Sequence, residues 1–127
     1  MLLFLFVFMA FLTYGSILIL NVFCARHNIA ISDVNGDYLY EDLYLRSWDL
    51  AQGIKDLLGH DVSSARVCLF CPGSMSHVMA VWATWMAGHV AVPLCPSTDQ
   101  ARLEHVIMDT KADLVITTVD QVSKVNC

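Results

Sequence analysis

The sequence predicts an α/β fold, a partial doubly wound parallel sheet with an N-terminal hairpin, preceded by one hydrophobic helix of the transmembrane type. Two short apolar runs, at residues 67–71 and 90–94, enclose a helical stretch whose length fits a right-handed parallel crossover. A second helical pattern and a third apolar run follow up to residue 117. Earlier in the chain, Asn35-Gly36 separates two strand-like runs and is typical of a hairpin turn.

The N-terminal block, Met1 to Cys24, carries no charged side chain. At the rise of a helix its length would be about 36 Å, enough for a bilayer core of about 30 Å. The block is therefore predicted to be a transmembrane or signal-anchor segment, which would place the chain at a membrane. Two alternatives stay open. One is a cleaved signal peptide, although the basic n-region is missing; the other is a mis-specified start of the chain.

The first elements after this block are a hairpin over residues 28–40, expected at a sheet edge, and a helix over residues 41–58. The helix is recognised from a repeating apolar face, and Gly59 is expected to end it. The predicted face consists of Leu43, Ser47, Leu50, Ala51, Ile54, Leu57 and Leu58.

The central unit begins with a strand at Val67 to Cys71, closed by Pro72-Gly73. Ser74 or Ser76 can cap the helix that follows, and Gly88 lies just beyond its expected C-cap. The apolar stripe of this helix, expected to cover the sheet, consists of Val78, Val81, Trp82, Trp85 and Met86. Because Trp82 and Trp85 lie on this stripe, both tryptophans are predicted to lie in the core. Val90 to Leu94 is predicted as the next strand.

The last elements are a helix and a strand. Ser97 and Gln100 have the spacing of a capping box, and an apolar stripe continues to about Thr110. Leu114 to Thr117 is predicted as the last strand. The domain prediction is a soluble unit over residues 28–118 and a polar tail over residues 119–127, with one sheet edge left bare and able to pair with a partner.

Charge and cysteine content exclude several classes of function. The formal net charge is −5 and no run of Lys or Arg occurs, which argues against a nucleic-acid partner. Of the five cysteines, Cys68, Cys71 and Cys95 lie in or beside predicted core strands, as expected for reduced, buried thiols. Cys68 and Cys71 have the CxxC spacing but lie within a strand, which disfavours a redox or zinc site.

No catalytic, cofactor-binding or metal-ligating residue is predicted. Ser74 and Ser76 lack the surroundings of a nucleophile elbow, and no glycine-rich run ends in lysine. Four acidic residues near the hairpin match no calcium loop and are interpreted as a solvated edge; they are Asp33, Asp37, Glu41 and Asp42. Five histidines without ligand spacing are interpreted as surface or helix-end residues; they are His27, His60, His77, His89 and His105.

Several stretches, in this order, resemble the N-terminal region of the adenylate-forming acyl-CoA synthetase superfamily. They are Tyr40-Glu41-Asp42-Leu43, the strand at Arg66-Val67, Ala83-Thr84-Trp85-Met86-Ala87-Gly88-His89-Val90-Ala91-Val92-Pro93-Leu94, and Leu103-Glu104-His105-Val106-Ile107-Met108-Asp109. Among the branches, the Trp82 and Trp85 pair with the strand ending at Leu94 looks most like the malonate or methylmalonate CoA ligases. The chain departs from the family at Leu39, where a Thr is usual, and at the apolar N-terminal block.

The resemblance implies ATP-dependent activation of a carboxylate, with magnesium and coenzyme A, in the family as a whole. The family's Ser/Thr/Gly-rich phosphate loop ending in Pro-Lys-Gly does not occur in this sequence. We therefore expect no cofactor on this chain and no catalysis by it alone. The alternative is a membrane-anchored interaction or regulatory module that pairs its bare sheet edge with a full-length synthetase subunit. The resemblance also gives the mitochondrion as an alternative location.

Overall fold

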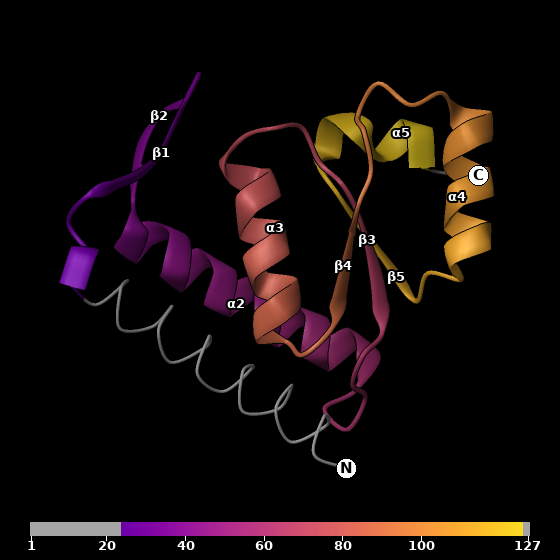
Figure 1. Cartoon of the computed structure of the whole chain (residues 1–127), viewed down its shortest axis with the longest axis horizontal. Helices are drawn as coiled ribbons and strands as arrows, with labels where there is room; N and C mark the ends of the chain where they lie inside the picture. Colours follow the sequence, from indigo (N-terminus) through magenta and orange to yellow (C-terminus); the bar gives the residue numbers. More distant parts are fainter. Residues whose placement is uncertain (1–23, 126–127) are drawn as a thin grey trace, which may run out of the picture.

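The computed structural model describes residues 24–125 and contains two small sheets (Figure 1). The first is an antiparallel hairpin of β1 (Ile29–Asp33) and β2 (Gly36–Leu39). The second has the order β4-β3-β5, with β3 (Arg66–Phe70) paired in parallel to both β4 (Val90–Pro93) and β5 (Leu114–Thr117).

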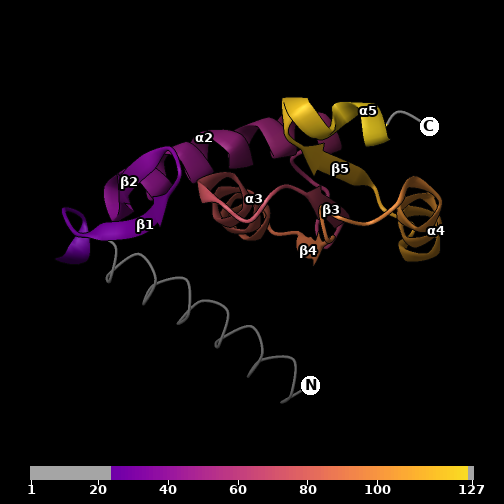
Figure 2. The same ribbon diagram turned by 90° about the horizontal axis from the view of Figure 1, so that it is seen from above.

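Among the described residues, three helices of more than two turns pack around the second sheet. They are α2 (Tyr40–Leu58), α3 (Met75–Met86) and α4 (Gln100–Thr110). A 3₁₀ turn (Val119–Gln121) and the short α5 (Val122–Val125) follow β5. Seen from above, α3 and α4 flank the sheet from opposite sides, and α2 lies beside α3 (Figure 2). The crossovers before and after β4 therefore cover different faces of the sheet.

The predicted fold class needs correction in two respects. The fold is mixed α/β with two small sheets, because the hairpin forms a sheet of its own and does not extend the parallel sheet. In addition, no helix within residues 24–125 combines the length and the apolar character needed to cross a bilayer. The predicted spanning segment, Met1 to Cys24, lies outside the described residues apart from Cys24, so the structure gives the transmembrane helix no support.

The hairpin turn differs from the prediction by one residue. Asp33 pairs with Gly36, so Val34 and Asn35 are the two turn residues. Within the described chain, non-glycine residues with positive φ are Ser64 and Lys111. Asn35 therefore lacks the left-handed conformation that a type I′ turn requires. Its amide donates instead to the Asp33 carboxylate at 2.7 Å, which stabilises the turn from within.

The core is centred on β3, the middle strand. Val67 to Phe70 are all completely buried, as expected for a strand covered on both faces. One face carries Val67, Leu69 and Cys71, which pack with Ala80 of α3. The other face includes Cys68, whose Sγ lies 3.7 Å from Thr110 Oγ1 of α4.

Helix α3 buries a different face from the predicted one. Its buried residues are Met75, Ala80, Ala83 and Thr84. Trp85, predicted as core, is 51% exposed, and Trp82 is only partly buried. The reason is the packing of α3 on α2, where Ala83 and Ala87 contact Ala51 and Ile54. Small side chains allow two helices to approach closely, which the bulky stripe could not do.

Helix α2 follows its prediction at most positions. Leu43, Ser47, Ala51 and Ile54 are buried, as the periodicity predicts. Leu57 is the exception, with 75% of its surface exposed. Gly59 follows the helix with φ +102°, and its amide donates to the carbonyl of Lys55.

Candidate functional site

The carboxyl ends of the parallel strands are the place where open α/β sheets usually bind ligands. At this end, the Thr117 hydroxyl of β5 donates to the carbonyl of Phe70 in β3 at 3.0 Å. The Cys71 thiol, just beyond β3, points to the carbonyl of Ile116 at 3.7 Å. Side chains thus fasten the ends of β3 and β5 to one another.

The N-terminus of α3 lies at the same edge and is closed by local acceptors. Ser74 is the N-cap, and its Oγ accepts from the amide of Ser76 at 3.3 Å. The amide of Met75 donates to the Asp33 carboxylate at 3.1 Å. Hydrogen bonds from the amides of Met75, Asn35 and Gly36 hold the pKa of Asp33 below its ordinary value of 3.8. An anionic group therefore already occupies the end of the helix dipole.

The segment after β4 contains an exposed thiol. Cys95 Sγ lies 2.9 Å from Ser97 Oγ. Hydrogen bonds from the Ser97 hydroxyl and then from its amide lower the pKa of Cys95 from the ordinary 9.0. The cap of α4 differs from the predicted box, because Asp99 and not Ser97 is the N-cap and accepts from the amide of Arg102 at 2.9 Å.

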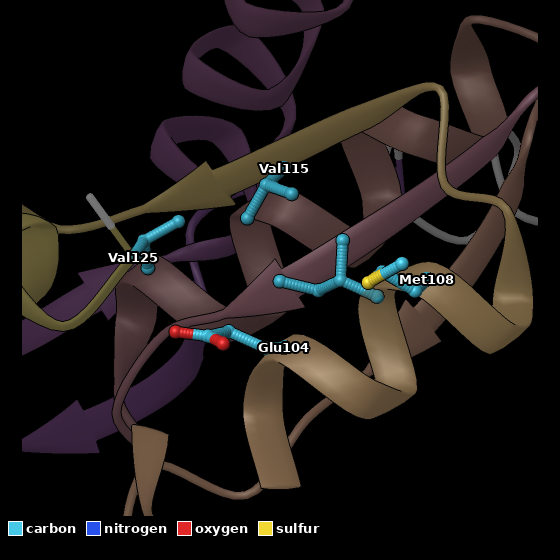
Figure 3. Close-up of a pocket in the computed structure, with 5 residues that line it drawn as sticks. Glu104, Met108, Val115 and Val125 are labelled. Atoms are coloured by element: carbon cyan, nitrogen blue, oxygen red, sulfur yellow. The ribbon is translucent and has the colours of Figure 1, made fainter. Parts of the chain in front are cut away.

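A shallow hollow of about 250 Å³ lies between α4, β5 and α5. Figure 3 shows its wall, in which Met108, Val115 and Val125 supply apolar surface and Glu104 the carboxylate. Ile107 completes the lining. With one acid and no base or nucleophile, this set of residues can hold an apolar group but offers no paired acid and base for catalysis.

The two thiols of the CxxC spacing lie on opposite faces of the chain at β3. Cys68 faces Thr110 of α4, whereas Cys71 packs with the cluster beside α3. Both are free and buried. Burial raises the pKa of the Cys71 thiol, and the Asp120 carboxylate raises it further. These features agree with structural thiols, as the sequence predicts for these two cysteines, but Cys95, expected to be buried, is exposed.

The acidic residues of the hairpin have local partners. Besides Asp33, Asp37 accepts from the Ser32 hydroxyl at 2.6 Å, and Asp42 accepts from the amide of Leu39 at 3.2 Å. Leu39 is the N-cap of α2 and supplies no side-chain hydrogen bond, as its replacement of a hydroxyl residue implies. Within the part of the chain that the structure describes, no three His, Cys, Asp or Glu side chains are placed to hold a metal ion.

His89, which the sequence analysis interprets as a surface or helix-end residue, is buried in the structure. His89 is 4% exposed, and its Nδ1 accepts from the amide of Ala65 at 3.2 Å. Its Nε2 is buried without a hydrogen-bond partner. The sequence offers no signal for this role except the position of His89 between Gly88 and a strand.

The comparisons with known proteins identify the family. The AMP-binding enzyme family matches residues 23–126. The mitochondrial malonate–CoA ligase ACSF3 of Xenopus laevis is 41% identical over 90 residues, which are 68% of this chain and 16% of that relative. The human malonate–CoA ligase ACSF3, also mitochondrial, is 42% identical over 91 residues, which are 69% of this chain and again 16% of the relative. The chain thus spans about a sixth of the length of these curated relatives.

Solved structures share the fold. A benzoate CoA ligase from Burkholderia xenovorans superimposes with a TM-score of 0.79 at 20% identity, over 88% of this chain and 22% of that chain. ATP-bound MatB from Rhodopseudomonas palustris gives a TM-score of 0.67 at 23% identity, over 79% of this chain and 20% of that chain. From the match over residues 23–126, the chain belongs to the AMP-binding enzyme family.

Proposed function

We propose that this chain forms part of the N-terminal region of a carboxylate–CoA ligase, in which ATP drives conversion of an acid, malonate by similarity, to its CoA thioester. The observation that carries the proposal is the 41% identity to the malonate–CoA ligase of Xenopus laevis over 90 residues. An identity of this size over 90 residues supports the substrate class, while the likeness to solved structures supports the fold.

The contribution of the described residues is structural. The N-terminus of α3 does not fit a phosphate, because Asp33 and Ser74 already accept from its first amides and Asp33 is an anion. We therefore assign no reaction step to ATP at this position. Residues 66–117 supply the buried strand β3, which packs between α3 and α4. In a whole ligase, this part of the sheet would support the residues of the active site.

A chimera tests the proposal. The 90 residues of the Xenopus laevis enzyme that align with this chain would be replaced by the residues of this chain. We expect malonyl-CoA synthesis within about tenfold of the parent, because protein cores tolerate many simultaneous hydrophobic substitutions when total volume and patterning are kept. Coenzyme A consumption with malonate, ATP and magnesium is the measurement.

The control for this chimera carries Val67→Asp, which buries an unpaired charge in β3 and should abolish folding. A chimera that melts cooperatively like the parent, yet makes no thioester from malonate, would contradict the malonate assignment. If the same folded protein used another carboxylate, the ligase assignment would stand and only the substrate would change.

A second candidate function is association with a ligase subunit through β5. Within the described sheet, β5 has a neighbour on one side only, and the hollow beside it is apolar. We expect Val115→Lys to weaken binding of this chain to malonate–CoA ligase subunits in a titration followed by sedimentation. Val90→Lys, on the opposite edge strand, is the matched control, since Val90 is 48% exposed. Equal binding by both variants would contradict the use of this edge.

The names of the ACSF3 relatives support a mitochondrial location for the whole protein. A fluorescent fusion at the C-terminus should then coincide with a mitochondrial dye in cells. A diffuse signal, or one in another organelle, would argue against this location.

A further inference from the structure

His89 lies where the chain just before β3 meets the chain at the start of β4, a junction that we call the seam. The amide of Ser64 donates to the carbonyl of Gly88 at 3.0 Å. The amide of Val90 donates to the carbonyl of Ala65 at 2.8 Å. Between these two backbone bonds, the amide of Ala65 donates to Nδ1 of His89 at 3.2 Å. A side chain therefore supplies the middle hydrogen bond of the seam.

The hydrogen bond at Nδ1 determines where the neutral imidazole of His89 carries its hydrogen. A nitrogen that accepts from an amide carries none, so the hydrogen of the neutral ring is on Nε2. Within the described residues Nε2 is buried without a hydrogen-bond partner, and His89 as a whole is 4% exposed. Protonation of the ring would place a second donor against the amide of Ala65 and would bury a positive charge.

Among the residues that the structure describes, no charged side chain hydrogen-bonds to this ring. Strand β4 has no ionisable side chain. In α3 the ionisable side chain is His77 in the first turn, whereas Thr84, near the other end, accepts from the amide of His89. On the far side of β3 from β4, the carboxylate of Asp113 accepts from the amide of Arg66 at 2.8 Å.

The end of α2 that packs on α3, together with the loop after it, adds four charged or titratable groups near the seam; they are Lys55, Asp56, His60 and Asp61. Asp56 and His60 bind each other at 3.0 Å on the exposed surface. An imidazolium at position 89 would thus have no hydrogen-bonded carboxylate to offset its charge.

We infer that His89 is an acid-sensitive clamp, whose neutral ring closes the seam and whose protonation opens it. In the unfolded chain, a histidine in water takes up a proton at about pH 6.5. The closed seam excludes this proton, so the unfolded state binds more protons in acid and the free energy of unfolding falls as the pH decreases. Opening of the seam releases the start of β4, an edge strand of the described sheet, from β3. The clamp is independent of the proposed ligase activity.

Urea denaturation of the full chain as a function of pH tests the inference. His89→Asn is the informative variant, because an amide oxygen can accept from Ala65 but the amide group does not titrate. Between about pH 7.5 and about pH 5.5, the unfolding equilibrium constant of the parent should rise about tenfold more than that of His89→Asn. Equal pH dependence of the two chains would overturn the inference.

His77 provides the matched control, because its Nδ1 is also buried without a hydrogen-bond partner. The tenfold difference between histidine and asparagine at position 89 should persist when both chains also carry His77→Asn. If the difference vanished in that background, the acid sensitivity would belong to His77 and the clamp would be excluded.

NMR of the parent chain gives a second test that needs no substitution. At neutral pH, ¹⁵N spectra of the imidazole should show His89 protonated on Nε2 alone. As the ring takes up its second proton, the amide of Ala65 should lose protection from hydrogen exchange, corrected for the intrinsic rate, in step with the amide of Val90. A ring protonated on Nδ1 at neutral pH, or a ring that charges while Ala65 stays protected, would contradict the clamp.

Discussion

The carboxylate of Asp33 joins two parts of the chain that are distant in sequence. One oxygen accepts from the amide of Asn35 in its own turn, and the other accepts from the amide of Met75 in α3. The sequence could not predict the second contact, because an Asp two residues before Asn35 already has a local role in a turn. Only the packing of the hairpin against α3 brings the two groups together.

Asp33→Asn should lower the melting temperature at neutral pH. The folded-state pKa of Asp33 is below 3.8, so its contribution to stability is present above that pH. It is lost as the pH falls through the lower, folded-state pKa. The difference in melting temperature between variant and parent should therefore shrink in acid.

Asp37→Asn is the control for this pH series, because Asp37 accepts a hydrogen bond from Ser32 within the hairpin and none from α3. A difference for Asp33→Asn that stays constant from neutral pH to below 3 would contradict the role assigned to its charge.

Replacing His89 should show the cost of an unsatisfied buried amide. His89→Leu removes the acceptor for the amide of Ala65, and we expect a loss of about 1–3 kcal/mol in the free energy of unfolding. His89→Asn, whose carbonyl oxygen can replace Nδ1, should lose less. Urea denaturation of both variants measures this. A leucine variant as stable as the parent would show that Ala65 finds another partner.

At the scale of the elements, the apolar and polar pattern predicted the strands and helices to within a few residues. The observed β5 has the predicted bounds, Leu114–Thr117. What the pattern could not give was the inner face of α3, because a helix that is apolar nearly all round has no unique buried side. The buried side of α3 is set by its contact with α2, where Ala51 and Ile54 pack against Ala83 and Ala87. This contact between two helices cannot be read from the sequence of α3 alone.

Two glycines should respond to alanine in opposite directions. Gly88 has φ +83°, so Gly88→Ala should destabilise the chain by about 1 kcal/mol through backbone strain. Gly53 lies inside α2, and Gly53→Ala should stabilise by about 0.5–1 kcal/mol. At both positions an added Cβ meets nothing within 4 Å, so packing does not confound the comparison. Thermal unfolding of the two variants would contradict this account if the shifts had the same sign.

For the whole molecule, the separation of the two sheets was the feature that sequence reasoning missed. Strand patterns give the identity of each strand but not which sheet it joins, since edge pairing depends on how the helices pack. The side chains at the carboxyl ends of β3 and β5 are used to fasten strands, as Thr117 does.

Amide hydrogen exchange should follow this architecture. Val67 to Phe70 lie in a strand paired on both sides and completely buried, so their amides should exchange most slowly. The two-stranded hairpin should open at a lower free energy, because none of the residues of β1 and β2 is fully buried. Exchange measured by NMR would contradict this order if hairpin amides were as protected as those of β3.

The bond between Asp33 and Met75 has a consequence for the order of folding. It closes a loop across 42 residues, and the entropy cost of closure grows with the logarithm of that length. The hairpin turn, by contrast, needs contacts between near neighbours only. Docking of the hairpin on α3 should thus follow formation of β3 and α3, after the rate-limiting barrier. Loss of Asp33 would then accelerate unfolding while leaving the folding rate almost unchanged.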